Sequence, residues 1–305
     1  MSAQTWQKEG RHMDEGERIQ RPHVLFGFDG TTENDAALRW AVDETGRRGL
    51  DLVMCHCWHW PYASGHVDRD AEAIRRRAGE NLLERGVLRA RELGAQDVHG
   101  RLMRGPAAKA LLRASSTAEL IVIGAHERPD DGATALEVPA RADRPVIVVP
   151  DGSGGRRELV VAGVDGTARC DAALGFAFEE AVLRDWDLHV VYGCWEPAVV
   201  TDSELALFND RELLEKTRAA ELEEAVAPWR ERHPEIGMRV SLLLERPCEA
   251  LRDAVADAGL LVLGDRGTGL DPLGATSTSM LGRASCPVAI VPGRRSGVTA
   301  ARRAP

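Results

Sequence analysis

Two aspartates follow short apolar segments and begin the same triplet. Asp29 and Asp165 both start an Asp-Gly-Thr sequence after a run rich in Val, Leu or Phe. An aspartate at such a point caps the next helix or shapes the turn, and glycine permits tight backbone geometry there. The same carboxylate could instead contact the ribose or base of a ligand, and the sequence leaves both interpretations open.

A glycine-rich stretch follows the apolar segment GLLVLGD in the second half of the chain. Gly264 and Gly267 leave that segment. Gly274 then opens a run of small and hydroxyl residues that includes Thr276 and Ser277. Glycines let backbone amides approach an anion, and hydroxyl groups at a helix start add donors for phosphate. The pattern predicts a phosphate-binding loop without the lysine of a Walker A motif, since no GxxxxGK[ST] occurs.

The two Asp-Gly-Thr triplets belong to an internal repeat. HVLFGFDGTTENDAALRWAV begins at His23, and LVVAGVDGTARCDAALGFAF begins at Leu159. The closing segments RPVIVVP and CPVAIVP recur in the same order. Two copies of one domain explain this recurrence. We therefore predict a flexible leader over 1–21, a first domain over 22–150, a Gly-rich linker over 151–157, a second domain over 158–293 and a tail over 294–305.

Each copy alternates short apolar runs with longer segments of helical spacing. The runs predict strands over 23–29, 51–58, 97–104, 120–125 and 145–150, and again over 158–165, 187–195, 238–245, 260–265 and 287–292. Helices are predicted in the first copy over 33–48, 68–94, 106–117 and 133–142. Strands that are apolar on both faces belong to parallel sheets covered by helices. The expected α/β fold is two tandem, doubly wound, parallel five-stranded sheets, which bind ligands beyond the carboxyl ends of their strands.

Composition excludes several classes of protein. The 305 residues carry a formal net charge of −9, which argues against a nucleic-acid binder that works through bulk electrostatics. No apolar run approaches the roughly 18 residues of a membrane helix, and the first residues lack the apolar core of a secretory signal. The six cysteines form no CxxC pair. Buried thiols in a reducing compartment are the plain interpretation, so we expect a cytoplasmic protein.

The order of these motifs resembles the tandem-domain universal stress proteins of actinobacteria over nearly all of 23–292. The nucleotide motif of that family is Gly, two residues, Gly, nine residues, then Gly followed by Ser or Thr. In the second copy only six residues separate Gly267 from Gly274, and Ala275 replaces the hydroxyl residue. The resemblance implies an adenine nucleotide alpha hydrolase-like fold. It also implies that the two copies form a pseudo-twofold pair through their closing strands, which removes exposed sheet edges.

The resemblance also implies a site for an adenine nucleotide, either ATP or AMP or ADP, with or without Mg²⁺. Adenine and ribose would contact Gly163, Val164, Asp165 and Cys194, and the phosphates would meet Leu263, Gly264, Gly267, Gly274, Thr276 and Ser277. The matching, degenerate site of the first copy consists of Asp29, Cys57, Gly124, Gly132 and Thr134. There Glu127 replaces the second glycine, and Asp130 and Asp131 follow it. Each exposed acid repels phosphate by about 1 kcal/mol, so we expect weak binding or none.

The leading expectation is therefore a regulatory protein of the stress response that binds the nucleotide and is not an enzyme. No general base or water-positioning residue accompanies the loop. One alternative is a nucleotide-independent interaction scaffold, and a weaker one is a slow ATP hydrolase. The expected partners are an adenine nucleotide and an unidentified protein, with neither nucleic acid nor membrane. A homodimer of the internally paired chain stays open.

A cysteine- and histidine-rich segment, CHCWHWP, begins at Cys55. Cys55 and Cys57 share one face of the predicted strand, while His56 points to the other face. Zinc sites usually gather ligands from two separate segments, so ordinary packing is favoured over a metal site. The tryptophans expected to wall the cleft or a domain contact are Trp58, Trp60 and Trp195.

Overall fold

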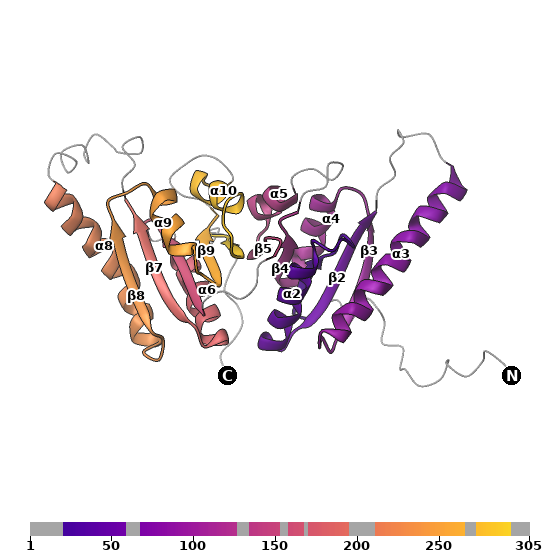
Figure 1. The fold of residues 1–305 in the computed structure, drawn as a ribbon, viewed down its shortest axis with the longest axis horizontal. Helices are drawn as coiled ribbons and strands as arrows, with labels where there is room; N and C mark the ends of the chain where they lie inside the picture. The colour runs from indigo at the N-terminus through magenta and orange to yellow at the C-terminus, as the bar shows by residue number, and fades with distance from the viewer. Residues whose placement is uncertain are drawn as a thin grey trace.

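The structure, a computed structural model, describes residues 21–58, 68–126, 134–152, 158–167, 170–194, 211–265 and 273–293 (Figure 1). These residues form one ten-stranded sheet with helices on both faces. Among the described helices, none combines the length and apolar character that a bilayer span needs.

The two halves of the chain repeat the same succession of elements. The first half contains β1 (His23–Gly27), α2 (Asp35–Arg48), β2 (Asp51–Trp58), α3 (Arg69–Glu92), β3 (Val98–Arg104), α4 (Ala107–Ala114), η1 (Ser115–Thr117), β4 (Ala118–Gly124), α5 (Thr134–Arg141) and β5 (Val146–Val149). The second half contains β6 (Leu159–Val164), α6 (Asp171–Arg184), β7 (Asp187–Gly193), α8 (Arg211–Arg232), β8 (Met238–Leu243), α9 (Pro247–Val255), β9 (Leu260–Gly264), α10 (Ala275–Leu281) and β10 (Val288–Val291). Every strand predicted from the sequence is present, and no strand end moves by more than two residues.

The sheet runs in the order β3-β2-β1-β4-β5-β10-β9-β6-β7-β8. All neighbours within each half are parallel. The two halves meet where β5 and β10 pair antiparallel, with Val148 opposite Val288 and Ile147 opposite Ala289. The predicted α/β fold is confirmed, and so is the pairing of the closing strands. The two predicted five-stranded sheets thereby become one continuous sheet.

The apolar core differs between the two faces of this sheet. Because successive strand residues alternate in direction, Val24 and Phe26 face one side and Leu25 the other. On the first side one continuous cluster runs through both halves under α2, α3, α6 and α8. On the other side α4 and α5 cover one cluster, and α9 and α10 cover a separate one. All three clusters need strands that are apolar on both faces, as the sequence indicated.

A buried ionic cluster joins α2 to α6 where the halves meet. Arg48 and Arg184 each form ion pairs with both Glu44 and Glu180. Both glutamate side chains are fully buried, and the Arg184 side chain is 2% exposed. Burial, together with the neighbouring Glu180 charge, raises the pKa of Glu44 to about 7. We call these four residues the ionic cluster.

Candidate functional site

The strand order reverses at the same place in each half. β1 lies between β2 and β4 in the first half, and β6 lies between β7 and β9 in the second. In doubly wound sheets the crevice for ligands opens at this reversal, beyond the carboxyl ends of the strands. The two Asp-Gly-Thr triplets follow β1 and β6, Asp29 two residues after Gly27 and Asp165 directly after Val164, so both lie where such a crevice is expected.

The aspartate of each triplet shapes a turn. Asp29 Oδ1 accepts hydrogen bonds from the backbone amide and the hydroxyl of Thr31, both at 2.8 Å. Asp165 Oδ1 accepts the same two bonds from Thr167, at 3.0 and 2.7 Å. The intervening Gly30 has a φ of +82°, a conformation that favours glycine. One carboxylate oxygen thus holds the turn, and the second oxygen lies outside this pair of bonds.

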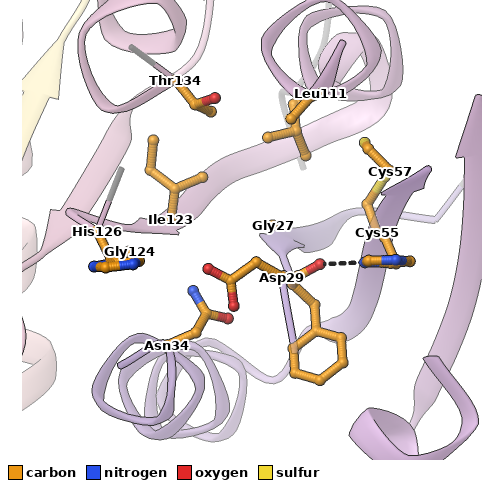
Figure 2. Close-up of a pocket in the computed structure, with 13 residues that line it drawn as sticks. Gly27, Asp29, Asn34, Cys55, Cys57, Leu111, Ile123, Gly124, His126 and Thr134 are labelled. Carbon is orange, nitrogen blue, oxygen red and sulfur yellow. Dashed lines mark hydrogen bonds between the residues drawn. The ribbon is translucent and has the colours of Figure 1, made fainter. Parts of the chain in front are cut away.

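The first half holds a pocket at its strand ends, with a cavity volume of about 70 Å³ (Figure 2). Four of the five residues predicted for the degenerate site line it: Asp29, Cys57, Gly124 and Thr134. Gly132 lies outside the described residues. The apolar part of the wall comes from residues such as Leu111 and Ile123. The structure therefore brings the described part of this predicted site together around one cavity.

Asn34 is a pocket residue that the sequence analysis did not select. Its side chain turns toward Asp29 in Figure 2, and the residue is only 3% exposed. Its Oδ1 is buried and has no hydrogen-bond partner among the described residues. An unsatisfied buried acceptor costs about 1–3 kcal/mol. A β-carbon at Gly124 would lie 2.8 Å from Asn34 Nδ2, so a larger residue there would push the amide group of Asn34 aside.

At the second-half strand ends, two of the donors implied for the phosphates bond to backbone carbonyls of the protein instead. Ser277 is buried, and its hydroxyl donates to the carbonyl of Gly264 at 2.9 Å. The amide of Gly274 donates to the carbonyl of Asp265 at 3.0 Å. Thr276, the other hydroxyl residue implied as a phosphate donor, takes part in neither of these two hydrogen bonds. Gly267 lies outside the described residues.

The floor of this second crevice is closely packed. A β-carbon at Gly163 would overlap Leu263 Cδ2 and lie 3.2 Å from Leu251. In the first half the corresponding β-carbon at Gly27 would lie 3.0 Å from the nearest atom, a methyl of Ile123. Leu263 on β9 therefore packs more closely against Gly163 than Ile123 on β4 packs against Gly27, which leaves less room for a ligand beside Gly163.

Cys194 lies on the opposite face of the sheet from Leu251 and Leu263. The register of β2 and β7 against β1 and β6 makes Gly193, and not Cys194, the residue of the second half that corresponds to Cys57. Cys194 packs against the cluster under α8. Burial raises the pKa of its thiol, and the charges around it come from α8, among them Arg218. Its contact with a nucleotide stays a prediction.

The other candidates fall in different places. The guanidinium of Arg104 lies 5.5 Å from the ring centre of Trp58, whereas Trp60 and Trp195 lie outside the described residues. Within the described segments, no group of three or more His, Cys, Asp or Glu side chains gathers to hold a metal ion.

The family model described as the universal stress protein family matches residues 21–150 and, a second time, residues 157–292. This chain belongs to the universal stress protein family. A universal stress protein of Mycolicibacterium smegmatis is 27% identical over 289 residues, which cover 88% of this chain and 96% of the relative. One of Mycobacterium tuberculosis strain H37Rv is 26% identical over 297 residues, with the same coverage.

Solved universal stress proteins share the fold. The crystal structure of one from Archaeoglobus fulgidus matches 90% of this chain and 98% of its own, with a TM-score of 0.65 at 17% identity. The resemblance read from the repeated motifs is thus confirmed at the level of family and fold. The exact domain boundaries and the nucleotide contacts stay predictions.

Proposed function

We propose that this universal stress protein is a regulatory protein that binds an adenine nucleotide in its second domain without turning it over. The turn at Asp165 is the observation that supports this most. It presents a carboxylate at the reversal of strand order, held by two bonds from Thr167. The oxygen outside those bonds is an acceptor for N–H or O–H donors, such as those of adenine and ribose.

Charge favours the second domain for the phosphates. Among the described residues that line the first-domain pocket, none is Lys or Arg. The sequence between that pocket's Gly124 and Gly132 adds Glu127, Asp130 and Asp131 against one arginine, a net charge of −2. The sequence between Gly264 and Gly274 adds Asp265 and Asp271 against one arginine, a net charge of −1, and it has the glycine Gly267. A phosphate chain therefore meets less repulsion in the second domain.

The groups described at the site support binding without turnover. Phosphoryl transfer needs a residue that orients the attacking water and charges that stabilise the transferred group. Asp165 is already engaged in its turn at the end assigned to adenine. Since the glycine loop is short, we expect AMP or ADP to bind at least as well as ATP.

A nucleotide-independent interaction scaffold is the second candidate. Two features of the second domain's strand ends favour it. The side chain of Leu263 occupies the space where a β-carbon of residue 163 would lie, and the Ser277 hydroxyl already donates its hydrogen bond to the carbonyl of Gly264. Both reduce the room and the donors for a ligand. On this hypothesis the fold serves contacts with another protein.

Calorimetric titration of ATP, ADP and AMP, with and without Mg²⁺, tests the proposal. We expect about one nucleotide per chain, loss of binding in Gly267→Glu, and equal or slightly higher affinity in the matched Glu127→Gly variant, because a side chain and a negative charge both disfavour phosphate. Unchanged affinity in Gly267→Glu would show that the site is elsewhere, and two nucleotides per chain would refute the asymmetry. No heat, together with a nucleotide-free mass in native mass spectrometry, would support the scaffold. Phosphate release above the Gly267→Glu control would contradict binding without turnover.

A further inference from the structure

Helix α3 presents an apolar stripe to solvent. The helix lies at the outer end of the first half, away from the junction with the second half (Figure 1). Its buried residues, among them Leu83 and Gly86, face the sheet. Ile74 and Leu88 lie on the outer side and are 70% and 57% exposed, the highest values among the large apolar residues that the structure describes. Packing within the described chain therefore leaves this face of α3 uncovered.

The stripe has the seven-residue spacing of helices that pair with another helix. Ile74, Asn81 and Leu88 repeat every seven residues. Ala78 and Arg85 each follow four residues later, so the five residues share one face of the helix. All five are exposed, and the four from Ala78 to Leu88 line a shallow groove. Such a row accommodates a second helix whose side chains pack between those of the first.

We propose that α3 pairs antiparallel with α3 of a second copy of this chain and so forms a homodimer. Charge complementarity identifies this partner. Along one border of the stripe, four residues follow one another at seven-residue spacing with alternating sign: Asp70, Arg77, Glu84 and Arg91. When two copies of the helix run antiparallel, this border faces the same border of the other copy. Asp70 then lies opposite Arg91 of the second copy. Arg77 likewise lies opposite Glu84, and the twofold symmetry repeats both pairs.

These border charges are largely unused within the chain. The side chains of Asp70, Glu84 and Arg91 are exposed and form no ion pair with another described residue. Arg77 makes one long contact, 3.4 Å from its Nη1 to Glu80 Oε2. Exposed ion pairs across an interface fix its register and direction more than they add affinity. The alternating charges thus favour one arrangement of two copies over others.

Arg85 determines the direction of the pair. In a parallel pair each position of the stripe faces its own copy, so Arg85 would meet Arg85. In the antiparallel register set by the border charges, Arg85 lies beside Ile74 of the second copy. Its aliphatic stem can then cover that side chain while the guanidinium stays in water. Antiparallel helices also bring opposite ends of their dipoles together.

The proposed interface is small. The 24 residues of α3 span about 36 Å at 1.5 Å per residue, and each chain contributes this one helix. Interfaces that bury less than roughly 1,200 Å² belong to transient complexes. We therefore expect a reversible monomer–dimer equilibrium at micromolar chain concentrations. The stripe lies away from the strand ends, so this inference is independent of the nucleotide proposed for the second domain.

Sedimentation equilibrium of the full-length chain over a range of concentrations tests the proposal. Arg77→Glu and Glu84→Lys each place like charges opposite one another twice in the dimer, so each variant should dimerise at least about tenfold more weakly than the wild type. An equal mixture of the two variants should recover dimers, because every facing pair in the heterodimer again has opposite signs. Higher salt should weaken the wild-type dimer, since exposed charges are screened.

The apolar part of the stripe is tested by Leu88→Gln, which should weaken dimerisation by about tenfold or more, because the lost contact counts twice in a twofold interface. Leu213→Gln is the matched control, since Leu213 is 47% exposed on α8, the helix of the second half that corresponds to α3. This control should dimerise as the wild type does, and circular dichroism checks that each variant is folded. A wild-type chain that stays monomeric up to millimolar concentration, wild-type dimerisation in both charge variants, or no recovery in their mixture would overturn the proposal.

Discussion

Replacing Arg184 by methionine should lower the free energy of unfolding by about 3–5 kcal/mol at pH 8, the usual cost of removing one member of a buried ion pair. Arg184 contacts both Glu44 and Glu180, and its Nε lies 2.9 Å from Glu180 Oε2. Methionine fills a similar volume without charge. Arg48 alone then faces two fully buried carboxylates, so one negative charge is left uncompensated.

The penalty should depend on pH in a definite direction. A glutamate left without Arg184 has its folded-state pKa raised further above the unfolded value of about 4.3. The folded state then holds a proton that the unfolded state releases, so stability is lost as pH rises through the folded-state pKa. Since the pKa of Glu44 is already about 7 in the intact cluster, the window lies between about pH 4.5 and 8. The destabilisation should be smaller at pH 5 than at pH 8.

Urea unfolding followed by circular dichroism at both pH values measures this. The control is Arg47→Met, because Arg47 contacts the half-exposed Asp43 at 2.8 Å and should cost at most about 1 kcal/mol. Adding Glu44→Gln to Arg184→Met should restore part of the loss, because it removes the uncompensated charge. A loss below about 1 kcal/mol for Arg184→Met at pH 8, or the same loss at pH 5, would refute the reasoning.

Two further predictions concern packing and acid stability. Gly193→Ala should destabilise the chain by about 1–3 kcal/mol, because its β-carbon would lie 2.8 Å from the Pro247 Cα. Gly46→Ala, in helix α2 with nothing within 4 Å, should stabilise it by about 0.5–1 kcal/mol; thermal melts that reverse this order would contradict the packing. Burial, and then the charge of Arg239, lower the pKa of His189 to about 4, so the unfolded state binds the proton first and stability should fall as pH drops from 6.5 to 4. His189→Asn should flatten that fall, by no more than about 3 kcal/mol, and a variant with the wild-type slope in urea unfolding would exclude His189 as its cause.

The sequence was a good guide to the strands and to the joining of the two halves. The apolar runs and the repeated Asp-Gly-Thr turns depend on neighbours along the chain, so the pattern carries them directly. The strongly apolar segment RPVIVVP also indicated a strand whose free edge needs a partner, and β10 pairs with that edge.

Contacts between distant segments were not visible in the sequence. Ser277, at the start of a helix, has the pattern of a phosphate donor, yet its hydroxyl reaches the carbonyl of Gly264 on β9. Asn34 has the pattern of a helix cap, but its side chain makes no cap bond and lines the pocket instead. Glu44 and Arg48 are typical of an exposed helical pair. In the structure both are largely buried and pair with charged residues of α6.

The ionic cluster has a consequence for how whole chains assemble. Glu44 and Arg48 on α2 repeat the spacing of Glu180 and Arg184 on α6, so each half carries both signs and is complementary to a copy of itself. The charges of the ionic cluster do not distinguish a half of the same chain from a half of another chain. The covalent connection selects the partner, because few residues separate the end of β5 from the start of β6. Short tethers give local concentrations in the millimolar range, so a chain cut between the halves would lose its preference for its own second half over that of a neighbouring chain.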